Sequence, residues 1–289
     1  MTQSTTRKRE PNRAIGEIIS QANGLSPEQV EHILVYQREK GVRFGEAAVG
    51  LRLVNNNDVL WALAQQFHYP YASKSNNKLN PELVVANQPF SSRAEGFRAM
   101  RSHLIMRMHN DPTEPRKALA VLSPNNGDGK TYFAANMATA FSQLSGRTLL
   151  IDADMRNPRQ HNIFGLQRNS IGLSTILSGR LASDVIQPVS ELPSLFILPV
   201  GITPPNPLEL IEGAAFGLLI RDLLAQFDHV IVDTPAASLG TDGAVIAARC
   251  GAAVMIARQN HSRVEAMQAI VETTNMSATQ LVGSVINEF

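Results

Sequence analysis

Residues 123–131 carry the residue types that bind polyphosphate. They read Ser-Pro-Asn-Asn-Gly-Asp-Gly-Lys-Thr and lie between an apolar run at residues 118–122 and a helix-forming run at residues 133–140. Gly127 and Gly129 would let backbone N–H groups turn inward around phosphate oxygens, and the helix start beyond them adds partial positive charge. The lysine can reach the β- and γ-phosphates of a nucleotide, and the threonine hydroxyl can bind Mg²⁺. The spacing therefore predicts a loop that binds nucleotide phosphates.

One position departs from the general phosphate-loop pattern. That pattern places a glycine five residues before Gly129, where this chain has Pro124. An ordinary turn between a strand and a helix, rich in glycine, asparagine and proline, would give a similar sequence. The choice between the two interpretations depends on whether other parts of the chain supply groups that bind a nucleotide and its cation.

Two apolar, strand-like runs end in aspartates. Residues 148–151 precede Asp152 and Asp154, and residues 229–232 precede Asp233. The carboxyl ends of parallel strands are where open sheets bind ligands, and alternation along an extended strand end would point Asp152 and Asp154 in the same direction. Neighbouring carboxylates repel one another unless a proton or a cation relieves them. Mg²⁺ bound to phosphates would do so, whereas solvated loop acids are the alternative.

Alternating strands and helices must bring these residues together. Beyond the runs already named, we expect strands at residues 195–198, 253–257 and 281–286, and helices at residues 208–226, 242–249 and 262–275. Strands that alternate with helices predict an α/β fold with a mostly parallel sheet covered by helices on both faces. In such a fold, the loop and both acidic strand ends lie at one edge of the sheet.

A further helix is expected at residues 93–108, directly before the first strand. Within it, Glu95, Arg98 and Arg101 follow the spacing Glu-x-x-Arg-x-x-Arg, which places them roughly along one helix face. Alone, this pattern is typical of a solvated charged face with one local ion pair worth a few tenths of a kcal/mol. Its place directly before a phosphate loop suggests a more specific role.

The N-terminal part of the chain contains an internal repeat. The residues Ile-Gly-Glu at 15–17 recur 29 residues later as Phe-Gly-Glu at 44–46. Each copy predicts a short helix, a turn and a second helix, which begins with a capping pair: Ser26 with Gln29, and Asn55 with Asp58. We therefore expect a disordered tail at residues 1–12, a small helical repeat domain at residues 13–71, a polar linker at residues 72–90 and a phosphate-loop domain at residues 91–289.

Bulk composition excludes several classes of function. The net charge is +1, with 18% charged residues, so no nucleic-acid partner is expected. The single cysteine, Cys250, cannot form an internal disulfide, which fits a reducing cytoplasm. No signal peptide is visible, and no apolar run approaches the roughly 20 residues that span a bilayer. We therefore expect a cytoplasmic protein whose contact with a membrane goes through a partner.

In these motifs, residues 90–289 resemble the bacterial tyrosine kinases (BY-kinases) of exopolysaccharide export, which are P-loop proteins related to the MinD/ParA ATPases. The family's loop reads Ser-x-x-Pro-Gly-x-Gly-Lys-Ser/Thr, which accommodates Pro124 but has proline where this chain has Asn126. Its second motif, apolar-Asp-x-Asp-apolar-Arg, is matched at residues 151–156, and its Walker B motif by Asp233 with the following Thr-Pro. Its self-association helix is matched by Glu95, Arg98 and Arg101.

The resemblance implies a P-loop NTPase fold of the MinD/ParA type and an ATP-dependent protein-tyrosine kinase that uses Mg²⁺. The nucleotide would be bound by Asn126, Gly127, Asp128, Gly129, Lys130, Thr131, Tyr132 and, near the adenine, Asn287. The Mg²⁺ ligands would be Thr131, Asp154 and Asp233. The catalytic residues would be Lys130, Asp154 and, as acceptor of the tyrosine proton, Asp152. Self-association would go through residues 95–101.

The same resemblance predicts the partners. A membrane-embedded polysaccharide chain-length regulator would activate the kinase and hold it at the inner membrane, and a protein tyrosine would be the substrate. Family members usually end in a cluster of tyrosines that they phosphorylate on one another, whereas this chain has only Tyr36, Tyr69, Tyr71 and Tyr132. That arrangement resembles the separate chain-length-determinant (EpsG-like) kinases. It also leaves open a second hypothesis, a MinD/ParA-like ATPase switch without kinase activity.

The N-terminal repeat resembles a different family. Residues 14–37 and 43–66 are similar to the two motifs of the N-terminal domain of type II secretion and pilus-extension ATPases (the MshEN family). Some members bind cyclic di-GMP through a motif arginine, which Arg43 matches in the second copy, whereas Ala14 stands at that position in the first. A cyclic di-GMP-responsive regulator acting through residues 13–66 is therefore a third hypothesis. A docking role is the alternative for this domain.

Overall fold

The computed structural model describes residues 14–66, 79–108, 115–166, 171–180 and 184–288. The chain divides into two compact units, Met1–Tyr71 and Ala72–Phe289, each with its own core. Three sequence predictions lie outside the described residues: the tail at residues 1–12, the tyrosines Tyr69 and Tyr71, and residues 72–78 of the linker. Within the described ranges, no helix combines the length and the apolar character needed to span a bilayer.

The described residues of the smaller unit form two pairs of helices, as the sequence repeat predicts. These helices are α1 (Ile15–Ala22), α2 (Pro27–Lys40), α3 (Phe44–Gly50) and α4 (Asn56–Gln66). The predicted capping pairs are present: Ser26 Oγ accepts a hydrogen bond from the Gln29 N–H at 3.2 Å, and Asn55 Oδ1 accepts one from the Asp58 N–H at 3.1 Å. Ile19, which is fully buried, lies in the core that the helices share.

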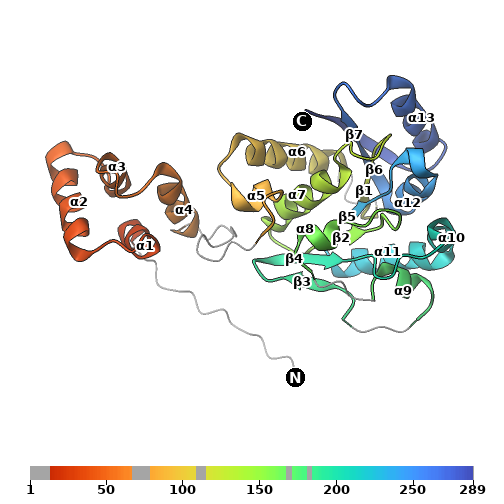
Figure 1. The fold of residues 1–289 in the computed structure, drawn as a ribbon, viewed down its shortest axis with the longest axis horizontal. Coiled ribbons are helices and arrows are strands. Elements are labelled where there is room, and N and C mark those ends of the chain that lie inside the picture. Colours follow the sequence, from red (N-terminus) through yellow and green to blue (C-terminus); the bar gives the residue numbers. More distant parts are fainter. Residues whose placement is uncertain (1–13, 67–78, 109–114, 167–170, 181–183, 289) are drawn as a thin grey trace. The chain divides into compact units, whose positions relative to one another are not determined.

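A mostly parallel sheet forms the centre of the larger unit (Figure 1). Its strands are β1 (Ala118–Leu122), β2 (Thr148–Asp152), β3 (Gln187–Val189), β4 (Leu192–Leu198), β5 (His229–Asp233), β6 (Gly251–Arg258) and β7 (Gln280–Asn287). Among the described residues, the order is β3-β4-β2-β5-β1-β6-β7, and only β3 with β4 is antiparallel. The predicted strands and their parallel arrangement are confirmed, whereas the short edge strand β3 was not expected.

Helices cover both faces of this sheet (Figure 1). They are α5 (Val84–Asn87), α6 (Ser92–Met108), α7 (Lys130–Ser142), α8 (Gln160–Ile163), α9 (Leu173–Leu177), α10 (Pro207–Glu212), α11 (Ala214–Gln226), α12 (Asp242–Cys250), α13 (Val264–Asn275) and the short 3₁₀ helix η2 (Ala237–Leu239). Successive residues of a strand point to opposite faces. Leu119 and Val121 accordingly pack with α5, α6 and α7, whereas Ala118 and Ala120 pack with α10 to α13.

Residues 79–90 correct the predicted linker. Its final part is not a linker, because α5 lies there and Leu83 is fully buried in the core beneath α7. Asn136 of α7 fixes this segment: its Oδ1 accepts a hydrogen bond from the Val85 N–H at 3.1 Å, and its Nδ2 donates to the Glu82 backbone oxygen at 2.8 Å. The surrounding proline and asparagine residues concealed an apolar run too short to show helical periodicity.

The region expected as one helix at residues 208–226 is two helices. α10 ends at Glu212 and α11 begins at Ala214, with Gly213 between them in an extended conformation. The other predicted helices of the larger unit, including the helix before β1, are present within a few residues of their expected bounds.

Candidate functional site

The phosphate loop connects the end of β1 to the start of α7. Gly127 and Gly129 have φ angles of +85° and +98°, values that residues with a side chain rarely adopt. Ser123 lies at the base of the loop, where its Oγ accepts a hydrogen bond from Lys130 Nζ at 3.0 Å and donates to the backbone oxygen of Asn125 at 2.9 Å. The Lys130 side chain is thus hydrogen-bonded to the first residue of the loop.

Asp128, within the loop, is fully buried and joins three segments of the chain. Its Oδ2 accepts a hydrogen bond from the Asn125 N–H at 2.7 Å, and its Oδ1 lies 2.9 Å from Nδ1 of His261, which follows β6. Its backbone oxygen accepts a hydrogen bond from Asn287 Nδ2 at 3.2 Å. Asn287 therefore lies at the loop. His261 was missed by sequence reasoning because 133 residues separate it from Asp128.

Three buried aspartates lie at the carboxyl edge of the sheet, and the charges of two of them, Asp154 and Asp233, act on Lys130. β5 runs between β1 and β2, and Asp233 pairs in register with Val121 on one side and with Asp152 on the other. Asp152 and Asp233 are fully buried, and Asp154 is 5% exposed. The fold thus brings together residues that separate sequence motifs contribute.

Burial and mutual repulsion shift the pKa values in this cluster. Burial, reinforced by the charge of Asp233, raises the pKa of Asp152 well above its usual value. Burial also raises the pKa of Asp233 to about 6, although the charge of Lys130 opposes that shift. Burial lowers the pKa of Lys130, and the neighbouring carboxylates counteract this effect. Because this buried cluster holds more carboxylates than lysines, a bound cation would stabilise its charged form.

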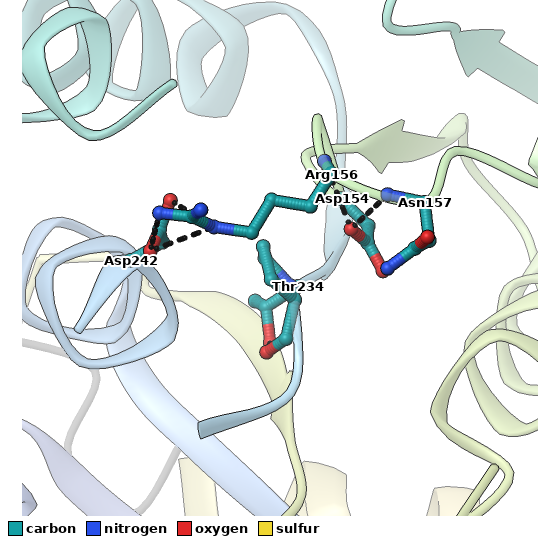
Figure 2. Close-up of polar contacts among 6 residues, drawn as sticks. Asp154, Arg156, Asn157, Thr234 and Asp242 are labelled. Carbon is teal, nitrogen blue, oxygen red and sulfur yellow. Dashed lines mark hydrogen bonds and ion pairs between the residues drawn. The ribbon is translucent and has the colours of Figure 1, made fainter. Parts of the chain in front are cut away.

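Backbone N–H groups hold the acid that ends β2 and the acid in the turn after it. Asp152 Oδ2 accepts hydrogen bonds from the N–H groups of Arg159 and Gln160 at 3.2 and 3.0 Å. Because β2 ends at Asp152, Asp154 lies in the following turn and not on the strand. Figure 2 shows Asp154 Oδ1 accepting hydrogen bonds from the next residues, at 3.2 Å from the Arg156 N–H and 2.8 Å from the Asn157 N–H. Turn geometry, in place of strand alternation, therefore orients Asp154.

The arginine that ends this acidic motif is anchored elsewhere. Figure 2 shows the Arg156 guanidinium paired with the carboxylate of Asp242, the first residue of α12. Thr234, drawn in the same view, follows Asp233 and donates a hydrogen bond from its Oγ1 to the Val121 backbone oxygen at 2.6 Å. These contacts fix the chain segments on either side of the carboxylate cluster.

Gln160, at the start of α8, also belongs to the site. It is fully buried, and its Nε2 donates hydrogen bonds to Asp233 Oδ2 at 2.9 Å and to the Thr131 backbone oxygen at 3.1 Å. No motif in the sequence points to this position, so only the structure places it among the carboxylates.

The residues present fit a divalent cation bound with phosphates. The Oδ1 atom of Asp233 is buried and has no hydrogen-bond partner among the described residues. In the described ranges, no group of three or more His, Cys, Asp or Glu side chains forms a metal cage of its own. Mg²⁺ does not require one, because it usually takes one or two carboxylates together with phosphate oxygens and water.

Two further predictions involve α6 and its neighbour α7. The Tyr132 ring packs edge-on against Phe97 with centroids 5.9 Å apart, so its side chain faces α6 and only its backbone belongs to the loop's helix start. Glu95 and Arg98 form an ion pair at 2.7 Å, and Arg101 donates a hydrogen bond to the Ala140 backbone oxygen of α7. The three charged residues therefore lie together on α6, outside the carboxylate cluster.

Comparison with known proteins gives consistent relatives. Residues 119–289 match the CobQ/CobB/MinD/ParA nucleotide binding domain. CapB of Staphylococcus aureus is 32% identical over 75% of this chain and 92% of its own length. The tyrosine-protein kinase CpsD of Streptococcus agalactiae is 31% identical over 60% of this chain and 75% of its own length.

A solved structure extends the comparison. The kinase domain of the Escherichia coli tyrosine kinase ETK superposes with a TM-score of 0.67 and 28% identity, covering 74% of this chain and 82% of that domain. The resemblance of residues 14–66 to the MshEN family stays a prediction. The agreement of sequence relatives, solved fold and site geometry leads to one conclusion: the chain belongs to the CobQ/CobB/MinD/ParA nucleotide-binding family and, within it, to the bacterial tyrosine-protein kinases.

Proposed function

We propose that this kinase transfers the γ-phosphoryl group of ATP, bound with Mg²⁺, to tyrosine side chains of another protein. The observation that carries the proposal is the convergence of Lys130 with buried Asp154 and Asp233, next to which Asp152 lies on the neighbouring strand. Phosphoryl transfer depends mainly on positioning and on neutralising charge. A preformed site with an unpaired, buried carboxylate oxygen on Asp233 suits that task.

Each residue of the site has a proposed role. The loop backbone at residues 126–132 and the Lys130 ammonium bind the phosphates, and Asn287 lies toward the adenine. Thr131, Asp154 and Asp233 hold Mg²⁺, which when bound neutralises charge on the transferring phosphoryl group. Asp152 accepts the tyrosine proton, a role that suits a carboxyl whose pKa is raised by burial.

The biological context follows from the resemblance to exopolysaccharide-export kinases. We propose that a membrane-embedded polysaccharide chain-length regulator binds and activates this kinase, which would place it at the cytoplasmic face of the inner membrane. The kinase would then regulate the length or export of the polymer. Self-association through residues 95–101 is part of the same proposal.

The test is incubation of the full chain with γ-labelled ATP and Mg²⁺, with and without the cytoplasmic segment of a membrane regulator from the same operon. Label on tyrosine is the expected result. Released phosphate without labelled protein would contradict the proposal and favour an ATPase switch. The Lys130→Met variant is the control, because loss of the ammonium removes charge stabilisation at the phosphates. Tyrosine label that persists in this variant would contradict the site assignment.

A further inference from the structure

Gln160 connects the three motifs of the site through a single residue. Its backbone N–H donates to Asp152 Oδ2 at 3.0 Å. Its side-chain Nε2 donates both to Asp233 Oδ2 at 2.9 Å and to the backbone oxygen of Thr131 at 3.1 Å. The ends of β2 and β5 and the first turn of α7 therefore meet at this glutamine.

The side-chain amide distinguishes the two oxygens of Asp233. Oδ2 accepts the hydrogen bond from Gln160, whereas Oδ1 is buried without a hydrogen-bond partner among the described residues. Rotation about the Cβ–Cγ bond of Asp233 would exchange its two oxygens, and the hydrogen bond from the Gln160 amide opposes that rotation. Hydrogen bonds of this kind orient the carboxylates that bind metals.

A purely structural role does not account for this amide. The Oε1 atom of Gln160 is buried and has no hydrogen-bond partner among the described residues, and the whole residue is inaccessible to solvent. A buried polar atom without a partner destabilises the fold, whereas an apolar side chain of the same shape would fill the space without that cost. The hydrogen bonds donated by Nε2 must therefore offset the cost of burying Oε1. Their acceptors are the Asp233 carboxylate and the Thr131 backbone oxygen.

We propose that Gln160 is a positioning residue for the catalytic cation: its side-chain amide holds Asp233 so that Oδ1 faces Mg²⁺ bound with the nucleotide. This inference rests on the proposed function. It concerns a residue outside the sequence motifs, and it predicts an effect on cation affinity that is separate from nucleotide affinity.

The variant Gln160→Met keeps the length of the side chain and removes both hydrogen bonds of the amide. The backbone N–H that binds Asp152 remains. Calorimetric titration of Mg²⁺ into the full chain loaded with ADP should give a dissociation constant about 10- to 100-fold higher than in the wild type. ADP affinity in EDTA should be unchanged, because Lys130 and the loop backbone are intact. In kinetics, the half-saturating Mg²⁺ concentration should rise while the rate at saturating Mg²⁺ recovers.

Gln143→Met is the matched control. Gln143 ends α7 at its other end, where its Nε2 donates to the Val85 backbone oxygen at 3.4 Å, and its loss should leave Mg²⁺ affinity unchanged. A cooperative thermal unfolding transition reports whether the Gln160→Met protein is folded. If that protein does not fold, Gln160→Asn withdraws the donor from Asp233 while keeping an amide in the site, and the same shift in Mg²⁺ affinity is expected.

The outcomes separate this inference from the proposed function. Wild-type Mg²⁺ affinity in the Gln160 variants would overturn the inference and leave the proposed function standing. A parallel loss of ADP affinity in EDTA would also overturn it, because it would show a structural role. If the wild-type chain binds ADP without any effect of Mg²⁺, the proposed cofactor assignment is itself wrong, and the inference is overturned with it.

Discussion

The Nη2 atom of Arg156 lies 2.9 Å from Oδ2 of Asp242, and its Nε lies 3.2 Å from Oδ1 of the same carboxylate. Asp242 is fully buried, whereas 31% of the Arg156 side chain is exposed. This pair therefore ties the turn that orients Asp154 to the first residue of α12.

The first prediction follows from this pair. Arg156→Met leaves a buried carboxylate without its cation and should lower the free energy of unfolding by about 2 kcal/mol, less than for a fully buried pair because the arginine is partly solvated. The double variant Arg156→Met/Asp242→Asn should recover much of the loss, because no buried charge remains. Urea unfolding measures both. A double variant less stable than Arg156→Met would contradict this account.

The second prediction concerns the contact between Asp128 and His261. His261→Ala removes one partner of a buried carboxylate inside the phosphate loop and should loosen that loop. We expect ADP to bind about fivefold more weakly, corresponding to about 1 kcal/mol for one hydrogen bond with a half-exposed partner. Calorimetry measures the change. His103→Ala, an exposed histidine on α6, is the control, and an equal effect in both variants would show that the contact is not responsible.

The third prediction is a pH dependence of stability without nucleotide, in EDTA. The pKa of Asp233 is about 6 in the folded protein against 3.8 as its usual value, so the folded state binds more protons between these values. The free energy of unfolding should therefore fall as the pH rises from about 4 to about 6. Asp233→Asn should weaken this dependence and be more stable than the wild type above pH 6.

Thermal unfolding at several pH values measures this effect. The difference between Asp233→Asn and the wild type should shrink toward pH 4, where the wild-type carboxyl is protonated too. The variant should at the same time lose Mg²⁺-dependent ADP binding. A constant difference across the pH range would show that the carboxylate charge is not the cause.

The fourth prediction separates the charged residues of α6. Glu95 is 70% exposed at its side chain, so Glu95→Ala should change self-association without changing the melting temperature. Arg101 donates to the Ala140 backbone oxygen within the same chain, so Arg101→Ala should lower the melting temperature as well. Light scattering and thermal unfolding distinguish the two effects. Unchanged particle mass in Glu95→Ala would argue against self-association through this residue.

The sequence was sufficient to predict the sheet because its strands are short runs of apolar residues. Two of them, β2 and β5, also end in the motif aspartates. β5 illustrates this: the run before Asp233 is buried on both faces, which leaves an unbroken apolar pattern in the sequence. The phosphate loop could be predicted for a similar reason, since glycine, lysine and threonine at fixed spacing have few other uses together.

The parts that the sequence did not reveal depend on contacts between distant residues. Gln160 meets Asp233 73 residues away, and no periodic pattern or motif marks either partner of such a contact. α5 was missed for a local reason, because its few apolar residues stand among prolines and asparagines that usually indicate a linker. Asp154 was placed on a strand end, whereas the structure shows a turn that begins one residue earlier.

Asn136 has a mechanical consequence. Its amide is bonded to residues at both sides of the segment 82–85, and it lies on α7, the helix whose first residue is Lys130. Residues 82–85 are therefore attached to the helix that begins at the phosphate loop. A force applied at residues 82–85, as in a pulling experiment, would act directly on the helix that begins with Lys130.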